Sequence, residues 1–215
     1  MELWSVDQFQ LLIFCDDHAQ FKNLSINARS IYASRCHNKL DELPVVASVH
    51  DFDILCVTES WLSSNVDNSC IPLSGYSEPF RLDRNYHGGV GVMAYVKRDL
   101  FCTRRRDLEQ LGVEIMWLDF KLTHRNRLLI AVCYQPPNSA AADRFLFRMC
   151  YSNVIKDFLS DALNTILFVG DFNDHSIDKP FQQQTELFRL FNRFNFHQVI
   201  QSPTRCTNIL DWFVI

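Results

Sequence analysis

The chain has 215 residues, a net charge of -4, 47% hydrophobic residues and 18 phenylalanines. This length fits one domain with a sizeable core, and the aromatic content excludes a disordered chain. No apolar run approaches the roughly 18 residues that a membrane span needs, so we expect none. The mild acidity excludes a strongly basic nucleic-acid surface but not a nuclease, because a metal ion can neutralise phosphate locally.

The cysteines and the N-terminal stretch indicate the compartment. Eight cysteines are spread along the chain without a Cys-x-x-Cys spacing, and Cys56 and Cys133 stand inside apolar runs typical of buried strands. We interpret them as free core thiols of a reducing compartment. The apolar stretch at 9–15 is preceded by acidic rather than basic residues, which argues against a signal peptide. We therefore expect an intracellular protein.

Secondary-structure elements can be assigned from Leu24 onward. Residues 1–23 stay unassigned because no turn residues mark where an element would begin or end. Residues 37–50 have roughly helical spacing, with Pro44 as a defect that predicts a kink. The remaining predicted elements are a short apolar entry at 24–27, a buried strand at 53–58, a loop with a short helical turn at 59–79, strands at 90–96, 113–122 and 128–134, a helix at 140–163, a strand at 165–169, an amphipathic helix at 182–194, and strand-like runs at 198–201 and 209–215.

Some of these strands look antiparallel and others are joined through helices. A turn at Arg125-Asn126 connects the strands at 113–122 and 128–134, which predicts an antiparallel pair. A mixed α+β sandwich therefore fits better than a doubly wound parallel sheet.

Polar residues at the carboxyl ends of apolar strands are the informative ones. A buried strand delivers its last side chain rigidly to one rim of a sheet, and several such ends can converge on one site. Residues placed in this way are Asn27, Glu59, Tyr134, Asp171 and Asn173, together with Asp211, which stands between Leu210 and Trp212.

These residue types suit phosphate chemistry with a hard cation. Mg²⁺ binds one or two carboxylates and keeps waters, and a second carboxylate can activate an attacking water. Amide and phenol donors hold phosphate oxygens where charge develops. Each residue alone also has a structural reading. In that reading Asp171 and Asn173 are ordinary turn residues and Glu59 is a solvated residue at the rim of the sheet. Tyr134 is then a packed aromatic, and Asp211 is a buried acid with a backbone partner.

Taken together and in order, six segments resemble the endonuclease/exonuclease/phosphatase superfamily, whose fold is DNase I-like. The closer resemblance is to the apurinic-endonuclease-like domain of LINE-type, jockey-like retrotransposons. It covers residues 24–215, and six segments in order are far more specific than any one of them. The segments are LSINARSI (24–31), DILCVTESWL (53–62), GGVGVMAYVK (88–97), AVCYQPPNS (131–139), GDFNDH (170–175) and PTRCTNILDWF (203–213).

The resemblance implies a four-layer α/β sandwich of two mixed β-sheets flanked by helices, and it implies roles for matching residues. Glu59 is similar to the Mg²⁺ ligand, with Asn27 and Asp171 in the same metal set and Mn²⁺ as an alternative ion. Asp171 also resembles the carboxylate that orients or deprotonates the attacking water, with Asn173 fixing substrate or water beside it. Tyr134 resembles the phenol that contacts the scissile phosphate.

Three further positions match DNA-contacting segments, and one matches a buried acid. Arg29 stands where the repair branch has an acidic residue, which favours the retrotransposon branch, and Thr204 and Arg205 fall in the segment that approaches the DNA backbone. Asp211 resembles the acid that orients the family's catalytic histidine. The family closes with Ser-Asp-His after its last core strand, and the chain ends at Ile215 before that motif. We therefore expect the domain at 24–215 to be incomplete at its C-terminus.

The resemblance implies a Mg²⁺-dependent endonuclease that hydrolyses a DNA phosphodiester and leaves a 3′-hydroxyl to prime reverse transcription. Its partner is DNA and not a membrane, and it acts in the nucleus if the target is genomic DNA. A reverse transcriptase domain is expected in the parent element but is absent from this chain. Two alternatives stay open, a catalytically inactive remnant and a phosphatase of the same superfamily. The oligomeric state is left open as well.

Overall fold

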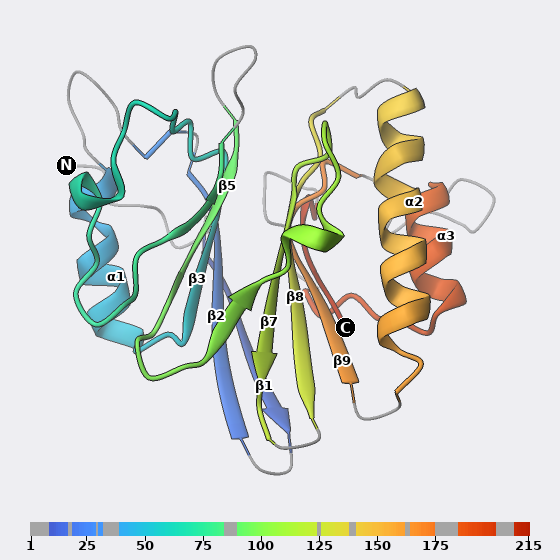
Figure 1. Cartoon of the computed structure of the whole chain (residues 1–215), viewed down its shortest axis with the longest axis horizontal. Helices are drawn as coiled ribbons and strands as arrows, with labels where there is room; N and C mark the ends of the chain where they lie inside the picture. The colour runs from blue at the N-terminus through green and yellow to red at the C-terminus, as the bar shows by residue number, and fades with distance from the viewer. Residues whose placement is uncertain are drawn as a thin grey trace. The chain divides into compact units, whose positions relative to one another are not determined.

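The computed structural model describes residues 9–16, 19–28, 30–31, 39–83, 90–123, 126–137, 141–161, 164–174, 185–200 and 209–215. The chain divides into two compact units, Met1–Cys102 and Thr103–Ile215. Each unit is built around one five-stranded mixed sheet (Figure 1).

The sheet of the first unit has the strand order β1-β2-β3-β5-β4. Strands β2 and β3 are parallel, and the other neighbouring pairs are antiparallel. Because β2 and β3 run the same way, their carboxyl ends lie at the same edge of the sheet. The strands are β1 (Phe9–Asp16), β2 (Ala19–Asn27), β3 (Ile54–Thr58), β4 (Phe80–Leu82) and β5 (Val92–Val96).

Helix α1 (Leu43–His50) covers one face of this sheet (Figure 1). Its Leu43 and Ala47 belong to one apolar cluster with Leu55 of β3. Pro44 stands in the first turn of the helix, where a missing N–H has no intrahelical acceptor to lose. The predicted kink is therefore wrong, because Pro44 helps to begin α1 rather than bending a longer helix.

The sheet of the second unit has the strand order β10-β9-β8-β7-β6. Strands β8 and β9 are parallel, whereas β7 and β10 pair antiparallel with β8 and β9. A parallel pair needs a crossover connection, and α2 (Ala141–Phe158) lies between the two strands in the chain. The strands are β6 (Cys102–Arg104), β7 (Ile115–Lys121), β8 (Arg127–Tyr134), β9 (Asn164–Asp171) and β10 (Asp211–Val214).

Helices α2 and α3 (Glu186–Arg193) pack on one face of the second sheet through aromatic side chains. The ring of Tyr151 from α2 meets Phe168 of β9 edge-on, with centroids 4.9 Å apart. Phe191 of α3 lies 4.8 Å from the same Phe168 ring. Each such pair adds about 0.5–1.5 kcal/mol beyond area burial. This cluster fixes both helices against β9, which lies between β10 and β8 in the sheet.

The predicted architecture of two mixed sheets with flanking helices is confirmed. Cys56 and Cys133 are buried and free, as predicted. Strand β1 occupies part of the N-terminal segment that the sequence left unassigned. Among the described residues, no helix combines the length and hydropathy that crossing a membrane requires.

The main differences from the predicted elements are short or marginal strands. The three-residue strands β4 and β6 were not predicted. Gln198, placed by the sequence in a strand-like run, makes only an isolated bridge to Val214. Asp171, predicted to follow its strand, is the last residue of β9.

We predict that two buried tyrosines of the first unit weaken the fold in alkali. Tyr76 donates to the carbonyl of Phe52 at 2.6 Å, and Tyr95 donates to the carbonyl of Ile71 at 2.8 Å. Burial raises the pKa of each phenol from 10.0 to about 12. Because the unfolded phenols ionise first, this contribution to the free energy of unfolding is full below pH 10 and is lost between pH 10 and 12.

The measurement is urea unfolding at several pH values, with the double variant Tyr76→Phe/Tyr95→Phe as the control. The wild-type protein should lose stability more steeply than the variant across that pH window. Equal slopes for the two proteins would contradict the prediction.

Candidate functional site

Asn27 and Glu59 lie together at the carboxyl edge of the parallel β2–β3 pair. The register sets Asn27 opposite Thr58, so Glu59 is the first residue beyond β3. The side-chain amide of Asn27 donates from Nδ2 to Oε1 of Glu59 at 2.9 Å. The parallel pairing thus joins two candidate residues that are 32 positions apart in the sequence.

The backbone after β3 has an unusual conformation that its neighbours hold in place. Glu59 and Trp61 both have positive φ, +52° and +55°, which costs a non-glycine residue about 1–3 kcal/mol. The carbonyl of Glu59 accepts from the amide of Ser30 at 2.8 Å, and the amide of Ser60 donates to the carbonyl of Gly91 at 3.1 Å. A strained backbone that surrounding hydrogen bonds hold in place is typical of functional sites.

The donors around Glu59 fit a hard divalent cation. In the part of the chain that the structure describes, no hydrogen bond reaches Oε2 of Glu59, and the buried hydroxyls of Thr58 and Ser60 lack partners. Buried hydroxyls without protein partners are places for ordered water, and Mg²⁺ keeps waters beside one or two carboxylates. Carboxylate and hydroxyl oxygens are ligands that a hard cation such as Mg²⁺ prefers.

In the second unit, three candidate residues stand in one row across neighbouring strands. Tyr134 is paired with Asp171, and Asp171 is paired with Asp211. Directly paired residues point to the same face of a sheet. All three side chains are buried, with Asp171 fully inaccessible. The row therefore places two carboxylates and a phenol on one face, opposite to the face that carries α2 and α3.

Asp171 and Asn173 are linked by a tight turn at the end of β9. The amide of Asn173 donates to Oδ1 of Asp171 at 3.0 Å, and Asn173 adopts a φ of +46°. The side chain of Asn173 donates from Nδ2 to the carbonyl of Gln135 at 2.9 Å, while the amide of Gln135 donates to the carbonyl of Asp171 at 2.9 Å. The Asp171 carboxylate is thus held by the amide of Asn173, and the Asn173 side chain is held by Gln135, the residue after β8.

Asp174, just beyond this turn, is connected to the start of α3. Thr185 is the N-cap of that helix and accepts from the amide of Phe188 at 3.3 Å. The hydroxyl of Thr185 also donates to the carboxylate of the buried Asp174. One threonine therefore caps the helix and ties it to the Asp171–Asn173 turn.

Gly170 is required for the close approach of β8 and β9. Its φ is +137°, and a Cβ built there would lie 2.0 Å from the carbonyl oxygen of Cys133. No real Cβ contact is that short, and the obstacle is backbone rather than a movable side chain. The glycine thereby sets the path of β9 immediately before Asp171.

We predict that Gly170→Ala lowers the free energy of unfolding by about 3 kcal/mol, because β8 and β9 must separate to admit the methyl group. Gly112→Ala is the matched control, since Gly112 also has positive φ (+83°) but nothing lies within 4 Å of its Cβ position. That variant should lose only about 1 kcal/mol, the cost of an alanine in left-handed backbone. Urea denaturation of both variants checks the difference, and equal losses would contradict the steric account.

Three predicted contacts fall outside the described residues, namely Arg29, Thr204 and Arg205. Sequence reasoning did not single out Gln135 or the hydroxyls of Thr58 and Ser60. Their positions in the sequence could have indicated them, because Gln135 follows the end of a strand and Thr58 and Ser60 flank Glu59.

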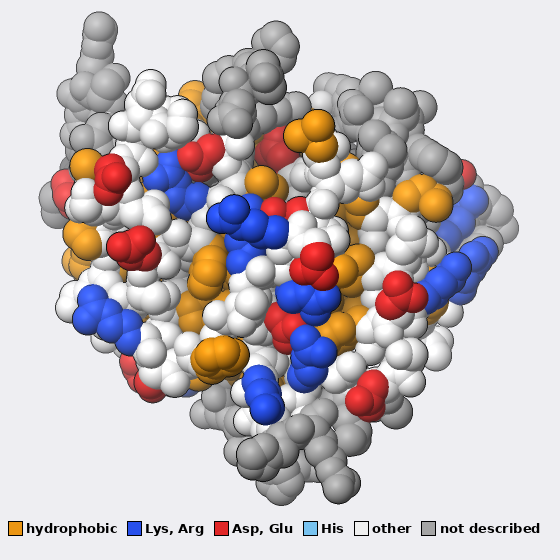
Figure 2. Space-filling view, viewed as in Figure 1, with side chains coloured by type: hydrophobic (Ala, Val, Ile, Leu, Met, Phe, Trp, Pro, Cys, Tyr) orange, Lys and Arg blue, Asp and Glu red, His pale blue; other side chains and the backbone are white. Residues whose placement is uncertain are grey.

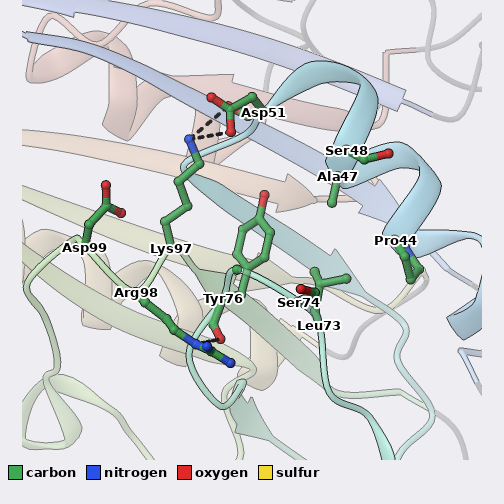
Figure 3. A pocket seen from close by; sticks show the side chains of 11 residues that line it. Pro44, Ala47, Ser48, Asp51, Leu73, Ser74, Tyr76, Lys97, Arg98 and Asp99 are labelled. Carbon is green, nitrogen blue, oxygen red and sulfur yellow. Dashed lines mark hydrogen bonds and ion pairs between the residues drawn. The ribbon is translucent and has the colours of Figure 1, made fainter.

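A separate hollow of about 860 Å³ lies at the opposite end of the first sheet from Glu59 (Figure 3). It is lined by α1, by the turn before Tyr76 and by the residues after β5. Lys97, whose amide bonds to the carbonyl of Asp53 at the start of β3, forms ion pairs with Asp51 at 2.9 Å and Asp53 at 3.1 Å. Lys97 is therefore already paired with two carboxylates, and the second cation that lines the hollow, Arg98, donates from Nε to the carbonyl of Tyr76 at 2.8 Å.

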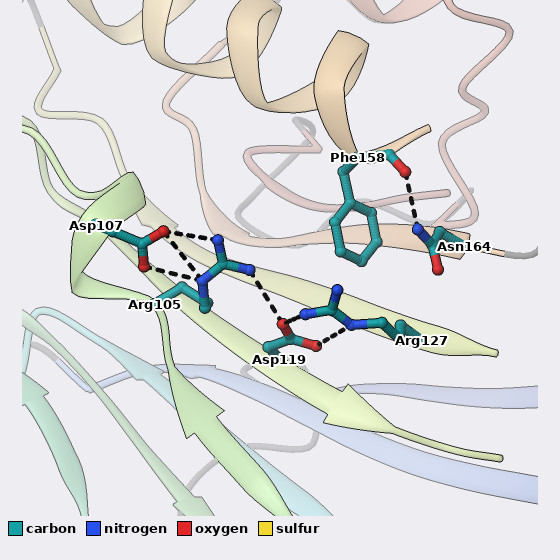
Figure 4. Close-up of polar contacts among 6 residues, drawn as sticks. All are labelled: Arg105, Asp107, Asp119, Arg127, Phe158 and Asn164. Atoms are coloured by element: carbon teal, nitrogen blue, oxygen red, sulfur yellow. Dashed lines mark hydrogen bonds and ion pairs between the residues drawn. The ribbon is translucent and has the colours of Figure 1, made fainter. Parts of the chain in front are cut away.

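Two arginines of the second unit, Arg105 and Arg127, are likewise paired with carboxylates (Figure 4). The buried carboxylate of Asp119 accepts from Arg127 and, at 3.2 Å, from Arg105. Arg105 also pairs with Asp107 at 2.6 Å, and this contact raises the pKa of Arg105 and lowers that of Asp107. On the face shown in Figure 2, basic and acidic side chains are interspersed in the same way. Charge alone therefore does not mark a phosphate-binding surface.

Comparison with known families gives one match over most of the chain. A model of the Endonuclease/Exonuclease/phosphatase family matches residues 24–213. A sequence search of the curated proteins finds no match.

Several solved structures are similar to the chain. The endonuclease domain of TRAS1, a telomere-specific non-LTR retrotransposon, gives a TM-score of 0.64 at 14% identity, covering 90% of this chain and 83% of that one. The AP endonuclease LMAP from Leishmania major gives 0.67 at 16% identity, covering 95% and 84%. The 3′ phosphatase NExo from Neisseria, solved with a product DNA hairpin, gives 0.63 at 10% identity, covering 90% and 86%. At these identities the similarity shows a shared fold.

Proposed function

Because the chain belongs to the endonuclease/exonuclease/phosphatase family and has its DNase I-like fold, we propose that it is a Mg²⁺-dependent DNA endonuclease of the LINE-type retrotransposon kind. In the proposed reaction, a water oxygen forms a bond to phosphorus while the bond from phosphorus to O3′ breaks. The leaving oxygen takes a proton and becomes a 3′-hydroxyl. The observation that supports the proposal most is the hydrogen bond between Asn27 and Glu59, where Glu59 has a strained backbone with positive φ.

Glu59 and Asn27 would hold the metal, with Mn²⁺ as an alternative ion. Mg²⁺ bound there would supply Lewis-acid polarisation of a phosphoryl oxygen. The hydrogen bond from Asn27 fixes the Glu59 carboxylate, so that Oε2 keeps one direction. Oxygen ligands that are already ordered bind a hard cation more tightly, because binding then costs little side-chain entropy.

Asp171 would orient the attacking water and accept its proton. Its Oδ1 is fixed by the amide of Asn173, which favours one orientation of the carboxylate. We assign Asn173 and Tyr134 as donors to phosphate oxygens, where they would stabilise developing charge. For Asp211, in register with Asp171, we propose the role that the resemblance implies, which is to orient the family's catalytic histidine.

The finer parts of the proposal rest on the quoted motifs and on the similarity to the TRAS1 endonuclease domain. We assign Arg29, Thr204 and Arg205 to the DNA backbone, with Asp171 as an additional member of the metal set. The 3′-hydroxyl would then serve a reverse transcriptase, which requires that the chain reach nuclear DNA.

A phosphatase is the second candidate, because the 3′ phosphatase NExo shares the fold. A phosphatase releases inorganic phosphate from an end, whereas an endonuclease breaks a strand without releasing any. Assaying both products from one incubation separates the two activities. A chain that folds and yields neither product would be an inactive remnant of the family.

We predict that the purified chain nicks supercoiled plasmid in Mg²⁺ and not in EDTA. Glu59→Gln and Asp171→Asn should each lower the nicking rate by about 10²–10³-fold, the loss typical of a group that acts on developing charge. Glu78→Gln is the matched control, since Glu78 is an exposed acid of the same unit as Glu59. Retention of wild-type rates in Glu59→Gln would refute the assignment of the site.

A second prediction concerns the metal without turnover. Mg²⁺ at about 100 times its Kd should raise the free energy of unfolding by about 2.7 kcal/mol, because the ion binds only the folded chain. Glu59→Ala should abolish this gain, and Asn27→Ala should reduce it, since the carboxylate would lose its hydrogen bond. Thermal unfolding with a Mg²⁺ titration measures both effects. An undiminished gain in Glu59→Ala would place the ion elsewhere.

A further inference from the structure

Trp61 is the exposed aromatic residue that follows Glu59 by two positions. Half of its side chain is accessible, whereas Trp117 and Trp212 are completely buried. Indole is a large apolar group, and burying it would remove a large area from water. In the described residues, no other ring packs against Trp61. The exposure therefore leaves an aromatic surface accessible two residues beyond the candidate metal ligand in the chain.

The backbone at Trp61 has an unfavourable conformation that backbone hydrogen bonds of neighbouring segments hold in place. Trp61 has a φ of +55°, which is a genuine outlier for a bulky residue. Its amide donates to the carbonyl of Val90 at 3.1 Å, and the preceding Ser60 bonds through its backbone to both Ile31 and Gly91. Ser60 itself is fully buried. Neighbouring segments therefore determine the conformation of Glu59, Ser60 and Trp61 together.

We propose that Trp61 is a stacking platform for an unpaired nucleobase of the nucleic acid that is cut at Glu59. This inference rests on the proposed function and adds a substrate preference to it. In an intact duplex the faces of each base are covered by its neighbours, so an indole can stack only on a base that is unpaired, unstacked or terminal. Every base has a π-face, and the contact therefore tolerates any sequence.

Stacking also suits the charge of this chain. The net charge is -4, and the arginines Arg105 and Arg127 are engaged by carboxylates. These two arginines are therefore not available to phosphate, and any affinity from phosphate contacts falls steeply with salt. An aromatic contact provides affinity that depends less on salt. The site would select DNA with a bulged, frayed or single-stranded base rather than fully paired DNA.

The test is a fluorescence anisotropy titration of the full chain in EDTA, where hydrolysis does not proceed. The probes are a single strand, a duplex with a one-base bulge and a fully paired duplex of the same sequence. The wild-type chain should bind the first two more tightly. Trp61→Ala should weaken these two by about 5–100-fold and leave the paired duplex unchanged, whereas Trp61→Phe should keep most of the affinity.

Phe101→Ala is the matched control, because Phe101 is another exposed aromatic of the first unit and should leave all three affinities unchanged. Urea unfolding of each variant separates loss of binding from loss of folding. An unchanged Kd in Trp61→Ala, an equal loss on all three probes, or a wild-type chain without preference would overturn the inference.

Plasmid nicking in Mg²⁺, run in parallel, distinguishes this failure from failure of the proposed function. Glu59-dependent nicking with Trp61-independent binding would overturn the stacking role and leave the endonuclease standing. Trp61-dependent binding without nicking would support the stacking role and overturn the proposed endonuclease activity.

Discussion

Parallel pairing of two neighbouring strands is the constraint on which the candidate residues of both units depend. In each sheet one parallel pair, β2–β3 or β8–β9, brings two strand ends to the same edge. An antiparallel pair would send the second end to the far side of its sheet. Asn27 therefore reaches Glu59, and Tyr134 is paired with Asp171, because strands distant in sequence run in the same direction.

The buried strands and their polar ends were predictable from the sequence, because their apolar runs are long and end abruptly. Strand β3 is buried at every position, and Glu59 follows it directly. The short strands β4 and β6 were missed because each has only three residues, none of them buried, and depends on its neighbour for pairing. Pro44 was misjudged because a proline predicts a kink or a helix start equally well until the boundary of the helix is known.

The site was predictable in its residue types but not in its backbone. The types of Asn27, Glu59, Asp171 and Asn173 follow from the chemistry of a hard cation and phosphate. The positive φ of Glu59 and Trp61 has no local signal, because neither residue favours that region. Contacts with Ser30 and Gly91, which are distant in sequence, impose it. The requirement for glycine at position 170 also has no local signal, because it comes from the close approach of Cys133 on the neighbouring strand.

The bond between Thr185 and Asp174 has a consequence for how this chain tolerates insertions. Residues 175–184 are bounded on one side by the Asp171–Asn173 turn and on the other by the cap of α3, and these two boundaries are bonded to each other. Lengthening a segment whose ends are already joined costs little, about 0.6 kcal/mol for each doubling of its length. Insertions and deletions between these anchors can therefore accumulate while the carboxylate turn and the helix keep their positions.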